Sequence, residues 1–160
     1  MNGPHDDLPP ASGTLVIGVG NDYRSDDAAG LGVARRLRKL APDRFTIVEH
    51  SGEGTALVES FGQADEVIVV DAVSSGAPPG SIHRCNAIDE TMPREFSRHS
   101  SHVVGVAEAI ELARVLKRLP RELVIYGIEG KSFQMGTGLC PEVARAVEKV
   151  ASMIVERKNG

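Results

Sequence analysis

Residues 14–40 read TLVIGVGNDYRSDDAAGLGVARRLRKL, and this stretch decides the fold class. It begins with a continuous apolar run at 14–18, which is typical of a central strand buried on both faces. A polar loop follows at 20–27, and a helical pattern with its apolar residues on one face occupies 28–40. A buried strand that leads directly into a helix predicts an α/β fold.

The same alternation of β-branched runs and helical patterns continues towards the C-terminus. We expect four more strands, at 45–48, 66–71, 81–85 and 123–126. We expect further helices at 55–61 and 102–119, and a last helix that begins at Pro141. The predicted fold class is therefore α/β, a single domain at 14–160 with helices on both faces of a twisted five-stranded sheet, mostly parallel with one antiparallel strand. Residues 1–13 are polar and rich in Pro and Gly, which predicts a flexible N-terminal tail.

The segment between the third and fourth strands sets the topology. Residues 73–80 are too few for a crossover helix, so the fourth strand should run antiparallel to the third. The chain must then return across the sheet before the helix at 102–119 begins, and residues 86–101 are long enough to do so. The loop at 20–27, the end of the third strand and the start of this helix then meet at the carboxyl edge of the parallel strands. Open α/β sheets bind their ligands at this edge.

Composition and charge exclude several functional classes. The 160 residues carry a formal net charge of −4, which disfavours a general electrostatic affinity for nucleic acid. No apolar run reaches the roughly 18 residues of a membrane span, and no secretory signal is visible. The two cysteines, Cys85 and Cys140, form no CxxC pair, so we expect a reduced, cytoplasmic protein.

Three side chains at the predicted edge have the chemistry of metal ligands. One of the loop aspartates, Asp26 or Asp27, and Asp71 supply carboxylate oxygens, and His102 supplies an imidazole nitrogen; such a set binds a transition metal and leaves coordination positions open. The residues alone do not choose between Asp26 and Asp27. Each residue also has a structural interpretation: either loop aspartate as a helix N-cap, Asp71 as a turn residue at a strand end, and His102 as a surface histidine.

Other motifs are weaker. Gly18 and Gly20 follow a strand as in a dinucleotide-binding turn, but Tyr23 stands where the third glycine belongs. Cys140 precedes a helix N-terminus, a position that lowers the pKa of a thiol, although a buried or incidental cysteine is the more common case. A nucleotide-binding enzyme is therefore a minor hypothesis.

Taken in order, these segments resemble the maturation endopeptidases of NiFe hydrogenases. The stretches that carry the resemblance are 16–21, 25–32, 67–73, 100–109 and 124–129, and together they extend it over residues 14–155. The resemblance implies a nickel-dependent endopeptidase that removes a C-terminal extension from the hydrogenase large-subunit precursor after nickel insertion. It implies that nickel arrives with this precursor, which is the expected partner.

The resemblance also assigns roles to individual residues. The family's metal ligands fall on Asp27, Asp71 and His102, which are then the catalytic residues as well. Members carry Glu or Asp at the first position, and Asp27 has the shorter reach. Two alternatives remain beside the nucleotide-binding enzyme: a metal-dependent assembly chaperone that escorts the precursor without cutting it, and a bacterial-spore-type protease of related fold.

Overall fold

A computed structural model describes residues 13–93, 96 and 105–157. A single sheet forms its centre, with strand order β2-β1-β3-β5-β4. The strands are β1 (Thr14–Val19), β2 (Thr46–His50), β3 (Glu66–Val73), β4 (Ile82–Asn86) and β5 (Glu122–Glu129). The first three and β5 are parallel, whereas β4 pairs antiparallel with β5. The direction of β4 confirms the prediction made from the short connection at 73–80. The predicted tail lies, apart from Gly13, outside the described residues.

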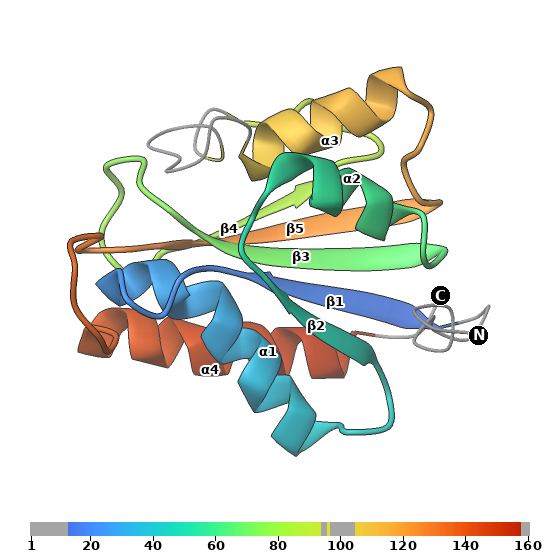
Figure 1. The fold of residues 1–160 in the computed structure, drawn as a ribbon. Coiled ribbons are helices and arrows are strands. Elements are labelled where there is room, and N and C mark those ends of the chain that lie inside the picture. Colours follow the sequence, from blue (N-terminus) through green and yellow to red (C-terminus); the bar gives the residue numbers. More distant parts are fainter. Residues whose placement is uncertain (1–12, 94–95, 97–104, 158–160) are drawn as a thin grey trace.

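Helices cover both faces of the sheet, as Figure 1 shows. The helices α1 (Ala29–Leu40) and α4 (Pro141–Glu156) lie on one face, and α2 (Gly54–Phe61) and α3 (Val106–Val115) lie on the other. The centre of β3 is apolar because both of its faces are buried. Val67 and Val69 pack into the core under α2 and α3, and Ile68 and Val70 pack into the core under α1 and α4. The α/β class with helices on both faces is thereby confirmed. None of the helices in the described ranges has the length and apolar character needed to cross a membrane.

The start of α1 packs against β1 so closely that their backbones are in contact. A Cβ atom on Gly18 would lie 2.3 Å from the carbonyl oxygen of Gly30, and a Cβ on Gly30 would lie 2.2 Å from that of Val19. Only glycine fits at these two positions, because backbone atoms occupy the space of a side chain. This packing explains Gly18, which lies within β1, whereas a Cβ on Gly20 would lie 2.3 Å from the carbonyl oxygen of Asp27. The packing of α1 on β1 also fixes the short 3-10 helix η2 (Ser25–Ala28) that precedes α1.

Two strands are longer than their sequence pattern predicts. β3 was expected to end at Asp71 and β5 at Tyr126, but each continues for two or three residues, and the added parts pair with each other. Gly127, which follows the strand predicted at 123–126, lies inside β5. The ring of Phe96 fills the space beside it, 2.8 Å from where a Cβ would be. A glycine within a strand marks this close approach and not a turn.

The helix predicted at 102–119 ends earlier in the structure, because α3 stops at Val115. Lys117 has a φ of 58°, and the N–H of Arg118 donates to the carbonyl of Ala113 at 2.8 Å, as in a Schellman motif that ends a helix. The apolar pattern conceals this end, because Leu119 still packs against the core although it lies outside the helix. The beginning of the predicted helix, at 102–104, lies outside the described residues.

Candidate active site

Two of the three predicted site residues lie together at the carboxyl edge of the sheet. Asp71 is on β3, in register with Gly127 of β5. Asp27 is in η2, which follows β1. Both side chains belong to half-buried residues, and the charge of Asp27 is near enough to raise the pKa of Asp71. The topology therefore places two carboxylates from separate segments at one position.

Asp71 is held in an unfavourable environment for a negative charge. Its burial, and then the charge of Asp27, raise the pKa of Asp71 to about 8. The backbone N–H of Ala72 donates a hydrogen bond to the Asp71 carboxylate at 2.9 Å, and this hydrogen bond by itself lowers the pKa of Asp71. A cation bound between the two carboxylates would relieve their mutual repulsion.

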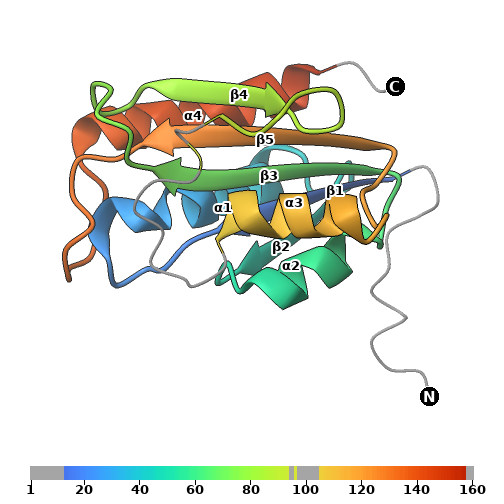
Figure 2. The same ribbon diagram turned by 90° about the horizontal axis from the view of Figure 1, so that it is seen from above.

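The third predicted ligand, His102, lies outside the described residues. Within 13–93, 96 and 105–157, no group of three or more His, Cys, Asp or Glu side chains is arranged to hold a metal ion. Figure 2 shows that α3 begins on the side of the sheet to which the arrows of β3 and β5 point.

Asp26 has a structural role that separates it from Asp27. Its side chain is 1% exposed, and its carboxylate accepts hydrogen bonds from the backbone N–H groups of Lys131 at 2.8 Å, Ser132 at 3.1 Å and Cys140 at 2.9 Å. All three donors lie between β5 and α4, so Asp26 holds that loop against η2. Neither aspartate caps a helix through its side chain, so the N-cap interpretation is wrong for both.

Asp26 also changes the interpretation of Cys140. Burial, and then the nearby Asp26 carboxylate, raise the pKa of the Cys140 thiol, although the backbone N–H of Val143 opposes them. The helix N-terminus therefore fails to activate this cysteine, and the interpretation of Cys140 as a reactive thiol is wrong. The more common case of an incidental, half-buried cysteine applies.

A second buried carboxylate, Glu129 at the end of β5, was missed by the sequence analysis. Glu129 is 2% exposed and accepts hydrogen bonds from the N–H and hydroxyl of Ser75, both at 2.7 Å, and from the N–H of Gly76 at 3.3 Å. His83 Nε2 lies 3.1 Å from Oε1, the oxygen that also accepts the hydrogen bond of the Ser75 hydroxyl. Burial by itself would raise the pKa of Glu129, but the hydrogen bonds from Ser75 and His83 lower it. A charged residue that ends an apolar run was the signal available in the sequence.

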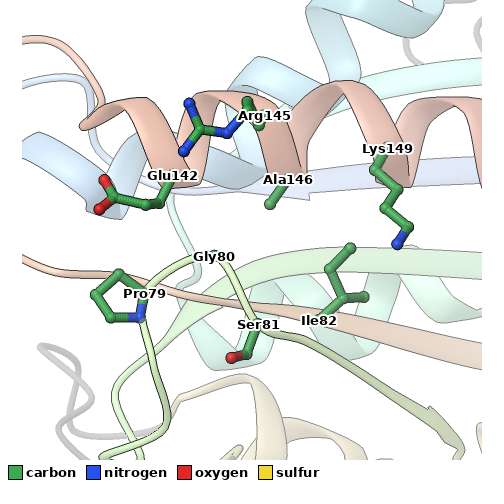
Figure 3. A pocket seen from close by; sticks show the side chains of 8 residues that line it. All are labelled: Pro79, Gly80, Ser81, Ile82, Glu142, Arg145, Ala146 and Lys149. Atoms are coloured by element: carbon green, nitrogen blue, oxygen red, sulfur yellow. The ribbon is translucent and has the colours of Figure 1, made fainter.

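A groove of about 340 Å³ lies beside the loop that leads into η2. It is lined by Gly20, Asn21, Asp22, Tyr23, Leu31, Glu49, His50 and Ser51. A larger groove, of about 480 Å³, lies between α4 and the beginning of β4, where Arg145 and Lys149 project from the helix over Gly80–Ile82 (Figure 3). Two strands, β3 and β5, separate this second groove from the β1 end of the sheet. The first groove is therefore the one on the side of Asp27, since Tyr23 in its lining lies four residues before Asp27 in the chain.

Comparison with known proteins identifies relatives of this chain. A model of the hydrogenase maturation protease family matches residues 32–157. The chain is 29% identical to the hydrogenase 2 maturation protease of Escherichia coli K12 over 145 residues, which are 88% of this chain and 87% of that protein. It is 31% identical over 140 residues to the hydrogenase expression/formation protein HoxM of Azotobacter vinelandii, covering 85% of this chain and 67% of that protein.

The same likeness holds in three dimensions. The solved structure of the hydrogenase maturating endopeptidase HybD from E. coli matches with a TM-score of 0.72 and 28% identity over 89% of each chain. The fold is shared as well with the NiFe hydrogenase maturation protease HycI from Thermococcus kodakarensis, with a TM-score of 0.69 at 22% identity over 91% of each chain.

Proposed function

Because this chain belongs to the hydrogenase maturation protease family, we propose that it removes a C-terminal extension from the large-subunit precursor of a NiFe hydrogenase once nickel is in place. The observation that carries the proposal is the pair of neighbouring carboxylates, Asp27 and Asp71, at the carboxyl edge of the sheet. Nickel is part of the substrate here, since it arrives within the precursor.

The donor set fits a metal that brings its own ligands. Two carboxylates and the imidazole of His102 leave coordination positions open, and the precursor's metal centre fills them. Nickel held in this way polarises the scissile carbonyl or lowers the pKa of a bound water. The carboxylates hold the precursor's metal, and one of them accepts the proton of the attacking water.

Two features of the described residues support this assignment. Burial and the charge of Asp27 disfavour the ionised form of Asp71, and a divalent ion between the two side chains would favour it. Asp26, the alternative ligand, already has both carboxylate oxygens engaged by backbone N–H groups. A metal contact at Asp26 would have to break these hydrogen bonds.

The decisive experiment is a mass measurement on the precursor before and after incubation with the protein. We expect the nickel-loaded precursor to lose its C-terminal peptide, and the nickel-free precursor, kept with a chelator, to remain intact. Equal cleavage of both would refute nickel-gated recognition. Cleavage of neither, together with binding of the nickel-loaded form, would favour a non-cleaving assembly chaperone.

A further inference from the structure

Two large apolar side chains are exposed side by side near Asp27. Tyr23 is 68% exposed and Met135 is 78% exposed. A parallel bridge between Arg24 and Gly136 brings residues 23 and 135 into register as neighbours, and the N–H of Gly136 donates to the carbonyl of Tyr23 at 3.0 Å. A single exposed apolar residue is ordinary, but an adjacent pair at the rim of a candidate site indicates a contact surface. We call this pair the Tyr23–Met135 surface.

The backbone beneath the Tyr23–Met135 surface is firmly held. The N–H of Ser25 donates to the carbonyl of Gly136 at 2.9 Å, and the hydroxyl of Ser25 donates to the carbonyl of Gln134 at 2.8 Å. The three hydrogen bonds to Asp26 hold the rest of the same loop. A surface that is ordered before binding loses less conformational entropy when a partner binds.

The Tyr23–Met135 surface lies close to Asp27 along the chain and borders a groove. Tyr23 lies four positions before Asp27 in the same loop and lines the groove of about 340 Å³, together with Leu31. The carboxylates at this groove are already paired, because Arg35 binds Asp22 at 2.9 Å and Glu49 at 2.8 Å. The surface therefore offers apolar contact in surroundings whose charges are balanced.

We propose that the Tyr23–Met135 surface binds an apolar side chain of the precursor polypeptide close to the bond that is cut. The inference rests on the proposed function, because the position of Tyr23 four residues before Asp27 identifies the occupant as the segment next to the scissile bond. At about 3.3 Å per extended residue, a chain that leaves Asp27 reaches Tyr23 within a few residues. Tyrosine is enriched among the residues that dominate binding energy, and methionine adapts to varied apolar partners.

The test compares variants in cleavage of the nickel-loaded precursor. The double variant Tyr23→Ala/Met135→Ala should raise KM about tenfold or more, with kcat within about twofold of wild type, because the surface contacts substrate away from the reacting atoms. Tyr23→Phe should keep KM near the wild-type value, since the ring supplies the contact. Val115→Ala is the matched control: Val115 is also 78% exposed, but it ends α3 at the opposite edge of the sheet.

Each other outcome has a defined meaning. If the wild type cuts the precursor and the double variant has an unchanged KM, the docking surface is wrong and the proposed function stands. If the wild type binds nickel-loaded precursor without cutting it, the peptidase proposal fails, and the dissociation constant of the precursor is measured in place of KM. Weaker binding by the double variant would then still support the Tyr23–Met135 surface as a docking site. Self-association in sedimentation that the double variant abolishes, with precursor binding unaltered, overturns the surface. Absence of both cutting and binding overturns both proposals.

Discussion

The carboxylate of Asp26 accepts a hydrogen bond from the backbone N–H of Cys140, 2.9 Å away in space and 114 residues further along the chain. With the hydrogen bonds from Lys131 and Ser132, this contact ties η2 to the loop before α4. Two adjacent aspartates therefore have different tasks. Asp26 holds the loop, and Asp27 lies beside Asp71.

Asp26→Ala should lower the free energy of unfolding by about 3–5 kcal/mol, because charge-assisted hydrogen bonds are lost and buried N–H groups stay unpaired. Urea unfolding at neutral pH measures the change. Asp22→Ala is the control in the same loop: its ion pair with Arg35 is largely exposed, so we expect about 0–1 kcal/mol. Equal effects of the two substitutions would contradict the role given to Asp26.

Asp27→Asn and Asp71→Asn should each lower kcat for precursor cleavage by about 100-fold or more, if these carboxylates hold the metal or accept a proton. The fold should persist in Asp71→Asn, because the amide oxygen can still accept the hydrogen bond from Ala72. Cleavage rates and circular dichroism spectra, taken on the same preparations, separate lost chemistry from lost structure. Near-normal cleavage by Asp71→Asn would count against metal contact at this residue.

Gly30→Ala should destabilise the protein by about 2–4 kcal/mol, because its Cβ would meet backbone carbonyl oxygens of both Val19 and Val70 within 2.3 Å. Gly32→Ala, two residues further in the same helix, would place its Cβ near side-chain methyl groups of Val147 and Leu139, at 3.4 Å or more. Helix propensity favours alanine by up to about 1 kcal/mol, so Gly32→Ala should be neutral or stabilising. Thermal unfolding of the pair tests the close packing of α1 on β1.

Lys117→Gly should stabilise the protein by about 0.5–1 kcal/mol. Lys117 occupies the left-handed region at φ 58°, where a β-carbon is unfavourable and glycine is not. The comparison with Lys117→Ala matters, because alanine removes the same charged side chain but keeps the β-carbon. If both variants shift the unfolding midpoint equally, the effect is one of charge and not of backbone conformation.

Glu129→Gln should reduce stability at pH 7 by about 1.5–3 kcal/mol, the size of charge-assisted hydrogen bonds. The pKa of Glu129 in the folded protein is lower than in the unfolded chain, because the hydrogen bonds from Ser75 and His83 outweigh burial. A lowered carboxyl pKa contributes stability that is present above the unfolded pKa of about 4.3 and is lost as the pH falls through the folded pKa.

The difference between wild type and Glu129→Gln should therefore shrink as the pH is lowered from about 5 towards 3. Urea unfolding of both proteins across this range measures it, since groups shared by the two proteins cancel in the difference. A difference that stays constant down to pH 3 would show that Glu129 is not held as a carboxylate in the folded state.

The sequence by itself determined the layers and the direction of every strand. Strands buried on both faces must be apolar along their centres, as 15–19 and 67–70 are, and this pattern can be recognised without coordinates. The connection at 73–80 is too short to hold a helix, so its length alone predicts that β4 runs antiparallel to its neighbour in the sheet. Because parallel strands share one carboxyl edge, the same reasoning brought Asp27 and Asp71 to one place.

Only the tertiary structure decided which aspartate does what. Asp26 and Asp27 are indistinguishable by local pattern, and they differ because Asp26 meets backbone donors more than 100 residues away. The same holds for Glu129, whose partners Ser75 and His83 come from other segments. Periodicity reports which face of an element is buried, but hydrogen bonds between distant segments depend on how the elements pack. That packing also determines that α3 ends just before Lys117, whose backbone is in the left-handed region, and that the ring of Phe96 lies beside Gly127. No local sequence signal indicates either feature.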